Sequence, residues 1–196
     1  INNAGTIYSE PLIKLGKNGF ECHSYKSWLN IINTNLNSTF LISSNVIEHL
    51  CNLRKESLII NVSSISALGN KGQSAYSASK SGAEQLCVAY HNTYKVPVMR
   101  INVMNAMGER QHVEKFIPKV IKKVLNDELV EIHSYPDKKT SGTRYYIHAR
   151  NIAAGVLFLL EKGNIGESYN LTGEKEVSNL EMAQIIANTI GKKLNY

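Results

Sequence analysis

Apolar and polar positions predict helices and buried strands in alternation along the first half of the chain. Over 27–53, apolar side chains recur three and four positions apart, which is typical of one helix or of two in succession. Short apolar runs over 58–62 and 96–103 predict buried strands, and 74–94 between them predicts a long helix. The stretch 6–24 is polar and irregular. Strand, helix and strand in this order indicate a parallel α/β sheet.

The second half is predicted to have shorter elements. They are a helix over 113–125, a strand over 129–133, a loop over 136–142, a strand over 145–147, a helix over 151–161, a strand over 168–171 and a last helix. We expect Asn179 to cap that last helix and Gly191 to end it, because these residue types favour those positions. The change in texture after Gly108 separates a first region, 1–108, from a second, 109–196.

Composition limits the protein classes that fit this pattern. A chain of 196 residues with 43% hydrophobic content is long enough to bury one sizeable core. Its three cysteines are widely spaced and form no Cys-x-x-Cys or Cys/His ligand pair, so we expect no disulfide framework and no metal site. We therefore expect a reducing, cytoplasmic setting. No apolar run approaches about 20 residues and no signal-peptide pattern opens the chain, so we expect no membrane partner.

The net charge of +6 narrows the possible partners. It arises from 22 basic and 16 acidic residues. The basic residues are scattered and form no arginine-rich or aromatic-interleaved stripe, so we expect no nucleic-acid partner. A positive balance also suits an enzyme for phosphorylated or nucleotide substrates.

Tyr76 and Lys80 are the candidate proton-transfer pair. Residues four apart share a helix face, so the lysine ammonium would favour the phenolate and lower a tyrosine pKa that is otherwise about 10. The same spacing also occurs where a packed ring lies beside a solvated lysine. Ser63 and Ser64 end the preceding strand, and a serine hydroxyl there would hold the substrate oxygen. Together these residues would form one proton-transfer site.

These motifs resemble those of the short-chain dehydrogenase/reductase superfamily. The first is Asn2-Asn3-Ala4-Gly5, which is similar to its NNAG turn; the others are Asn35 in TNLNSTF, NVSS and YSASK. The resemblance implies that Tyr76 is the acid/base, that Lys80 also holds the nicotinamide ribose and that Asn35 supports a relay water. It further implies that Asn3, Ala4 and Gly5 bind NAD or NADP. The helices carrying Asn35 and Tyr76 commonly pair between subunits in this superfamily, so a homodimer is expected.

The resemblance leaves two candidates for the catalytic serine. Counting back from Tyr76 as in ketoacyl reductases indicates Ser63. Aligning the strand end with sugar-nucleotide enzymes indicates Ser64, which we prefer because it follows directly from the strand pattern.

The second half resembles the extended sugar-nucleotide epimerases and dehydratases. The similarity lies in RINVMNAMGERQHVEKFIP and GESYNLTGEKEVSNLE. It implies that Asn105, Lys115 and Phe116 lie near the sugar nucleotide and that Arg144 meets its diphosphate. A guanidinium suits that role, because its planar fork matches phosphate oxygens.

The implied fold is a Rossmann-like, doubly wound parallel sheet whose first strands are missing, followed by a small α/β substrate-binding region. The resemblance implies that residues 1–108 form a partial dinucleotide-binding region that holds the catalytic residues. It implies that residues 109–196 are mainly substrate-binding, with some segments returning to the Rossmann-like core. We expect an N-terminal truncation, because the Gly-rich turn that cradles the cofactor pyrophosphate is absent, as is the residue that selects NAD or NADP.

One departure from the dehydratase pattern bears on the reaction. Dehydratases place an acidic pair after the serine or threonine, whereas this chain has Ile65 and Ser66. We therefore expect an NAD(P)-dependent oxidoreductase or epimerase acting on a nucleotide-linked sugar, without elimination of water. The alternatives are a simple ketoreductase and a truncated, non-catalytic binding or dimerisation module.

Overall fold

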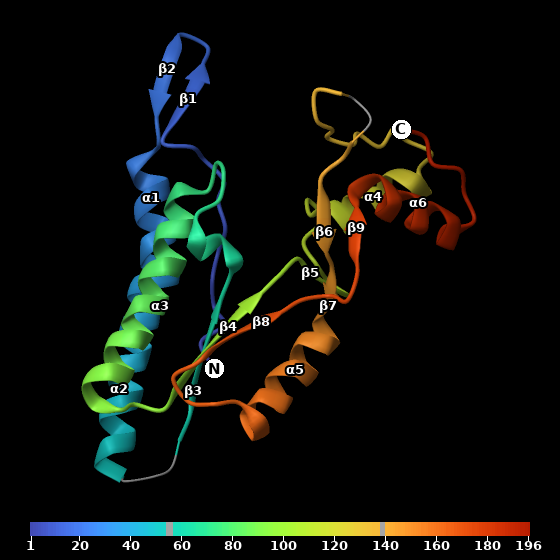
Figure 1. The fold of residues 1–196 in the computed structure, drawn as a ribbon. Helices are drawn as coiled ribbons and strands as arrows, with labels where there is room; N and C mark the ends of the chain where they lie inside the picture. Colours follow the sequence, from blue (N-terminus) through green and yellow to red (C-terminus); the bar gives the residue numbers. More distant parts are fainter. Residues whose placement is uncertain (54–56, 138–139) are drawn as a thin grey trace. The chain divides into compact units, whose positions relative to one another are not determined.

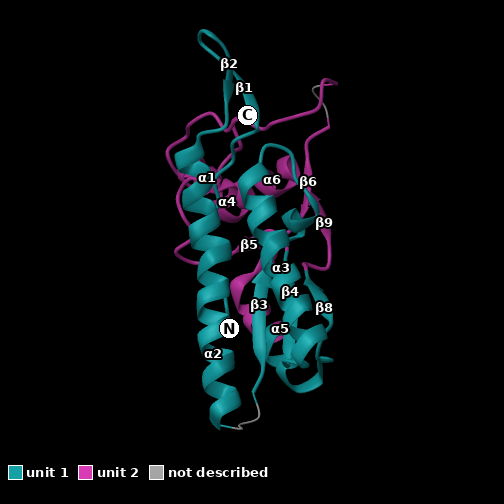
Figure 2. Cartoon of the chain, turned by 90° about the vertical axis from the view of Figure 1, so that its left-hand side faces the viewer, with its two compact units in different colours: residues 1–103, 156–171 teal, residues 104–155, 172–196 magenta. Residues whose placement is uncertain are grey.

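The computed structural model describes two compact units. The described residues are 1–53, 57–137 and 140–196. The first unit comprises residues 1–103 and 156–171, and the second comprises 104–155 and 172–196 (Figure 2). The chain thus leaves the first unit and returns to it through one helix and one strand. The functional division at Gly108 stays a prediction.

A parallel sheet forms the centre of the first unit (Figure 1). Its strands lie in the order β3 (Ile59–Ser63), β4 (Val98–Val103) and β8 (Ser168–Leu171), all parallel. Asn2 extends the sheet by pairing in parallel with Asn61 of β3. The predicted strands over 58–62, 96–103 and 168–171 are therefore confirmed, and with them the parallel α/β class.

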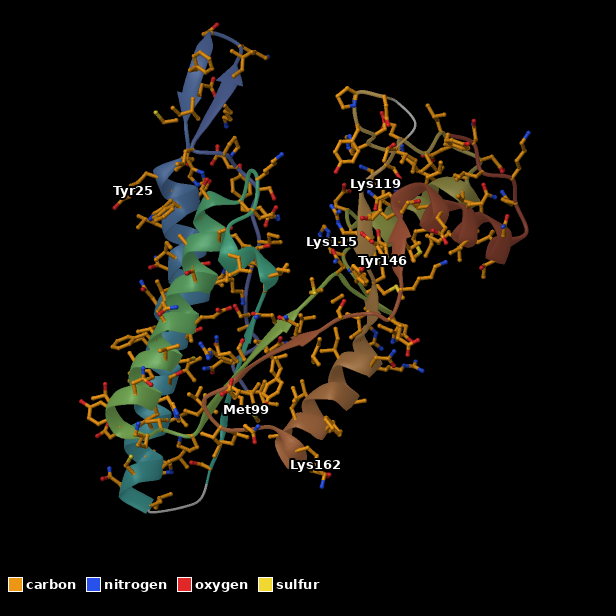
Figure 3. The ribbon with its side chains drawn as sticks, in the orientation of Figure 1. Tyr25, Met99, Lys115, Lys119, Tyr146 and Lys162 are labelled. Atoms are coloured by element: carbon orange, nitrogen blue, oxygen red, sulfur yellow. The ribbon has the colours of Figure 1, made fainter. Side chains whose placement is uncertain are left out.

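One face of this sheet is apolar. Alternate side chains of a strand point to the same face, and here they pack on the last two turns of α5 (Ala149–Lys162). The buried residues of this core are Ile60, Met99, Ile101 and Leu159, and Leu58, Val62, Val103, Val156, Tyr169 and Leu171 pack around them. Figure 3 labels Met99 on β4. Burial of such side chains stabilises the fold by about 1.5–3 kcal/mol each.

The other face is covered by α3 (Ser74–Tyr94), whose predicted bounds are confirmed. A long helix runs beside α3 and consists of α1 (Tyr25–Ile32), η1 (Asn33–Asn37) and α2 (Ser38–Leu53) (Figure 1). The segment η1 is a π-helical turn, which is wider than an α-helical turn. A side chain at Gly82 would lie 3.1 Å from Leu36, so the missing Cβ lets the two helices approach closely.

A β-hairpin occupies the stretch that the sequence pattern predicts to be irregular. It consists of β1 (Ile13–Gly16) and β2 (Gly19–Cys22), which pair antiparallel. Its side chains are largely exposed, with Leu15 at 78% and Phe20 at 83%. Because burial does not drive formation of the hairpin, the sequence of this stretch shows no buried-strand pattern. The available signal was the pair Asn18-Gly19, where the two-residue loop Lys17-Asn18 ends and Gly19 has φ +120°.

The second unit packs two helices together beside short strand pairs. β5 (Ala106–Met107) pairs in parallel with β7 (Ile147–His148), and β6 (Thr143–Tyr145) pairs antiparallel with β9 (Glu176–Ser178). The helices are α4 (Phe116–Leu125) and α6 (Asn179–Ile190). Their shared core consists of Val120, Val124, Val130, Ala183, Ile186, Ala187 and Leu194.

Two predictions about the second half are wrong. No strand forms over 129–133; Val130 packs instead on the helical core, and its N–H donates to the Asn195 carbonyl at 2.8 Å. The N-cap of α6 is Ser178 rather than Asn179, because the Ser178 hydroxyl accepts the Glu181 N–H at 3.0 Å. Gly191 ends that helix at φ +78°, as predicted.

None of the described helices is long and apolar enough to cross a membrane. Among the residues that the structure describes, no group of three or more His, Cys, Asp or Glu side chains is arranged to hold a metal ion.

Candidate active site

The candidate site lies at the carboxyl edge of the sheet in the first unit. The Asn2 N–H donates to the Ile60 carbonyl at 2.8 Å, and the Val62 N–H donates to the Asn2 carbonyl at 2.9 Å. This pairing brings the turn after Asn2 beside the end of β3, because parallel strands end at the same edge. Ligands bind at this edge in open α/β sheets.

Ser64 and Tyr76 meet at this edge. Ser64 precedes the short helix η2 (Ile65–Leu68), and its hydroxyl accepts the Ser66 N–H at 3.2 Å. The same hydroxyl is hydrogen-bonded to the Tyr76 phenol. The Ser63 hydroxyl is buried and has no hydrogen-bond partner among the described residues. The geometry thus brings Ser64 to Tyr76, while the catalytic role of either serine stays a prediction.

The Tyr76 phenol differs from the sequence expectation. Burial raises its pKa, and the hydrogen bond with Ser64 lowers it by less. The Lys80 Nζ lies 6.0 Å from the centre of the Tyr76 ring and donates to the Val62 carbonyl at 3.0 Å. The lowering of the pKa that we expected from Lys80 is therefore absent, because the ammonium is directed at the strand and the phenol is desolvated.

Replacing Ser64 by alanine is expected to raise the pKa of Tyr76 further. The substitution removes the hydrogen bond that lowers this pKa and leaves the burial that raises it. Tyrosinate absorbance during an alkaline titration, taken as the difference from Tyr76→Phe, measures the shift. Ser63→Ala is the matched control and should leave the titration unchanged. Equal curves for the two serine variants would contradict the assignment of Ser64.

Lys80 is buried and lies close to Gly5. Burial lowers the pKa of Lys80, and the negative charge of Glu84 raises it by less. A Cβ atom at Gly5 would lie 3.4 Å from both Lys80 Nζ and Asn35 Oδ1. The turn at Gly5 therefore passes within contact distance of two predicted site residues, and a side chain there would take up space beside the ammonium.

Asn35 acts as a clamp on this turn. Its Oδ1 accepts the Thr6 N–H at 2.8 Å, and its Nδ2 donates to the Thr6 carbonyl at 2.8 Å and to the Ser79 hydroxyl at 3.1 Å. The side chain is 1% exposed and sits in the wider turn η1. Such turns are rare and frequent at functional sites. The sequence singled out Asn35 but gave no sign of this bonding to the backbone.

The predicted substrate-binding residues lie in the second unit. Lys115, labelled in Figure 3, occupies the N-cap position of α4, and Phe116 begins that helix. Asn105 lies just before β5 with φ +45°. Arg144 lies in the exposed strand β6. Their roles toward a substrate stay predictions.

Two polar residues near Arg144, Tyr146 and Asn179, were not among the predicted site residues. The Tyr146 hydroxyl donates to Asn179 Oδ1 at 3.1 Å, and the positive charge of Arg144 lowers the Tyr146 pKa, which burial raises more strongly. A Cβ at Gly142 would lie 3.5 Å from the side chains of both Arg144 and Asn179. The available signal was the proximity of Tyr146 to Arg144 in the sequence.

Comparison with known proteins identifies the family. The family model described as the NAD dependent epimerase/dehydratase family matches residues 24–172. The chain belongs to this family. The epimerase/dehydratase resemblance predicted from the second half of the sequence is thereby confirmed.

Curated relatives of this epimerase/dehydratase-family chain include two with clear sequence identity. A dTDP-D-glucose 4,6-dehydratase of Dictyostelium discoideum is 39% identical over 113 residues, which cover 58% of this chain and 25% of the relative. The low-salt glycan biosynthesis protein Agl12 of Haloferax volcanii is 35% identical over 116 residues, covering 59% and 36%. The chain therefore matches about a third or less of the length of these relatives.

Solved structures of the epimerase/dehydratase type share the fold. A dTDP-glucose 4,6-dehydratase from Bacillus anthracis in complex with NAD has a TM-score of 0.73 at 25% identity, covering 84% of this chain and 54% of that one. A UDP-glucuronic acid 4-epimerase from Bacillus cereus, in complex with UDP-glucuronic acid and NAD, has a TM-score of 0.73 at 22% identity, covering 88% and 56%. The predicted Rossmann-like fold class is confirmed.

Proposed function

We propose that this chain carries the proton- and hydride-transfer site of an NAD(P)-dependent oxidoreductase or epimerase acting on a nucleotide-linked sugar. One observation carries the proposal: Ser64 and Lys80 flank Tyr76 at the carboxyl edge of the sheet, beside the turn at Gly5. The named activities of the relatives support the substrate class, since they include a dTDP-glucose dehydratase and a UDP-glucuronic acid epimerase.

The residues beside Gly5 fit a nicotinamide cofactor. The missing Cβ leaves space next to the Lys80 ammonium, and an ammonium is a suitable donor to ribose hydroxyls. Asn3, Ala4 and Gly5 would hold the cofactor from the turn, and Lys80 would hold its ribose. When bound, the cofactor supplies the hydride acceptor or donor.

Tyr76 would move the proton. In oxidation its phenolate accepts the hydroxyl proton of the sugar while hydride leaves the same carbon, and in reduction the phenol returns a proton to the oxygen. Ser64 would hold that oxygen by a hydrogen bond. Burial raises the pKa of Tyr76, which favours the protonated phenol that the reduction direction uses. Epimerisation uses the step twice, with the keto sugar turned over between transfers.

Elimination of water is not part of the proposal. Ser64 is followed by Ile65 and Ser66, and the sequence has no carboxyl side chain from there to Tyr76. The Ser66 N–H is engaged by Ser64, and the Ile65 side chain is 43% exposed. This short connection also supports a second candidate, a simple ketoreductase, whose substrates lack the nucleotide.

Ligand binding tests these alternatives. We expect NADH or NADPH to bind in a fluorescence titration, and a thermal-shift panel of UDP-, dTDP- and GDP-sugars to show stabilisation by at least one member. Stabilisation by none of them, together with turnover of simple ketones, would favour the ketoreductase. No binding of either cofactor at millimolar concentration would favour the non-catalytic binding or dimerisation module. Comparison of the NADH and NADPH titrations would also choose between NAD and NADP.

We also propose a homodimer in the cytoplasm. Phe40, Leu41 and Ile42 on α2 are 46%, 56% and 51% exposed, and such apolar surfaces often cover one another between subunits. The cysteines are free, which suits a reducing compartment. Light scattering of the chain and of a Leu41→Glu variant would test the dimer, because a charge on this surface should lower the measured mass. If the wild-type chain and the Leu41→Glu variant have the same measured mass, a dimer through this surface is contradicted.

A further inference from the structure

Beyond its first residue pair, the apolar Ile59 and Val98, the sheet face that lies under α3 is polar. On β3 the apolar Ile60 and Val62 alternate with Asn61 and Ser63, and on β4 Met99 and Ile101 alternate with Arg100 and Asn102. Because alternate residues face opposite sides, the polar set points away from the α5 core and toward α3. A face buried beneath a helix is usually apolar, so this one needs an explanation.

Helix α3 turns polar residues toward the same layer. Ser77, Lys80, Glu84 and Cys87 recur three and four positions apart and therefore share one helix face. Glu84 comes one turn after Lys80, which points to the strand by donating to the Val62 carbonyl at 3.0 Å. Two polar surfaces thus face each other in the interior of the first unit.

Many polar atoms in this layer have no protein partner. In the described ranges, the buried side-chain atoms of the layer without a hydrogen bond are Asn61 Nδ2, Ser63 Oγ, Ser77 Oγ, Glu84 Oε1, Tyr90 OH and Asn102 Oδ1. We refer to these six residues as the polar layer. Asn61 is 2% and Ser63 is 4% exposed. An unpaired buried polar group costs about 1–3 kcal/mol, and native proteins satisfy such groups with bound water.

We propose that bound water fills the polar layer and links the Glu84 carboxylate to the Lys80 ammonium, so that Glu84 is a positioning residue that keeps Lys80 charged. The atoms suit water: the Asn61 amide donates, the Glu84 and Asn102 oxygens accept, and the hydroxyls do both. This inference rests on the proposed function only for the use of Lys80 in proton transfer.

The charges around Lys80 support this assignment. Burial lowers the pKa of Lys80, and the Glu84 charge opposes that effect. Cys87 is neutral because burial raises its pKa to about 11, and the Arg100 guanidinium donates to the Gly166 carbonyl at 2.9 Å. The other titratable groups facing this region from α3 are Tyr76 and Tyr90, whose pKa values burial raises. Glu84 is thus the negative charge that favours the ammonium.

The test measures the ionisation of Lys80 in the whole chain. Glu84→Gln keeps the shape of the side chain and removes its charge. The rate at which an amine-acylating reagent modifies Lys80 is followed against pH by mass spectrometry of the peptide that contains it. We expect the curve to move to lower pH in Glu84→Gln, with Lys80 modified several-fold faster at neutral pH. Glu48→Gln, the same change at an exposed position of α2, should match the wild type.

Two results would overturn the inference. The first is a Lys80 curve that is unchanged in Glu84→Gln or moves equally in Glu48→Gln. The second is a high-resolution crystal structure in which no ordered water contacts Asn61 Nδ2 or Glu84 Oε1. If Glu84→Gln does not fold, Glu84→Asp retains the charge at a greater distance and should move the curve less, in the same direction; no movement would overturn the inference. None of these measurements requires activity, so they stand apart from a failure to bind cofactor.

Discussion

Tyr76→Phe is expected to lower kcat for sugar oxidation or reduction by about 10²- to 10⁴-fold, the range that general acid–base catalysis contributes. The substitution removes the hydroxyl that exchanges the proton and keeps the ring that packs beneath Lys80. Cofactor affinity should stay within a factor of about two, because the phenol is not proposed to carry the binding energy. Steady-state kinetics with the sugar nucleotide selected by thermal shift, together with a fluorescence titration, measure both quantities.

A matched control separates chemistry from folding in this experiment. Tyr25 begins α1 with 73% of its surface exposed (Figure 3), so Tyr25→Phe loses the same hydroxyl without touching the site. Its kcat should equal that of the wild type. Full activity in Tyr76→Phe would exclude Tyr76 as the acid/base, and equal losses in both variants would indicate a general effect on the fold.

Asn35→Ala is expected to lower the free energy of unfolding by about 2 kcal/mol, since an unsatisfied buried polar group costs about 1–3 kcal/mol. The alanine leaves the Thr6 N–H and carbonyl without their amide partner and removes the bond to Ser79. The same change should release the turn at Gly5 and speed hydrogen exchange at the Thr6 amide. Urea denaturation and exchange rates measure the two effects.

Asn37→Ala is the control for this prediction. Asn37 lies in the same turn, and its side chain is exposed. Among the described residues, that side chain bonds only to the Asn33 side chain four positions earlier, at 2.7 Å. Exposed substitutions usually change stability by less than about 0.5 kcal/mol. A loss as large as that of Asn35→Ala would show that the turn, rather than the clamp on Thr6, carries the effect.

The sequence predicted the elements whose side chains are buried. The strands over 59–63 and 98–103 and the helix over 74–94 were predictable because burial selects their apolar residues. The hairpin β1–β2 was missed because its side chains are exposed, so burial does not select apolar residues at alternate positions there. The strand expected around Val130 was wrong for the opposite reason: its apolar residues pack on helices, and the pattern alone does not distinguish the two surroundings.

The residues of the candidate site were predictable from the sequence, whereas their burial and hydrogen-bond partners were not. Ser64, Tyr76, Lys80, Asn35 and Gly5 lie together as their motifs imply. The direction of the Tyr76 pKa shift was not predictable, because it depends on desolvation in the folded chain. The bonding of Asn35 to Thr6 and the partners of Glu84 depend on contacts across the sheet, which spacing along the sequence does not show.

Helix α2 has a consequence for how this chain tolerates insertions and deletions. An α-helix advances by about 100° per residue, so deleting one residue between Ser38 and Ser43 would rotate everything beyond it around the helix axis. Ser43, which accepts the Asn2 side-chain amide at 2.9 Å, would then leave Asn2 even though every named residue was retained. The hairpin loop at Lys17-Asn18 carries no such phase relation. Length variation among natural variants should therefore gather at the hairpin and be absent from the helix.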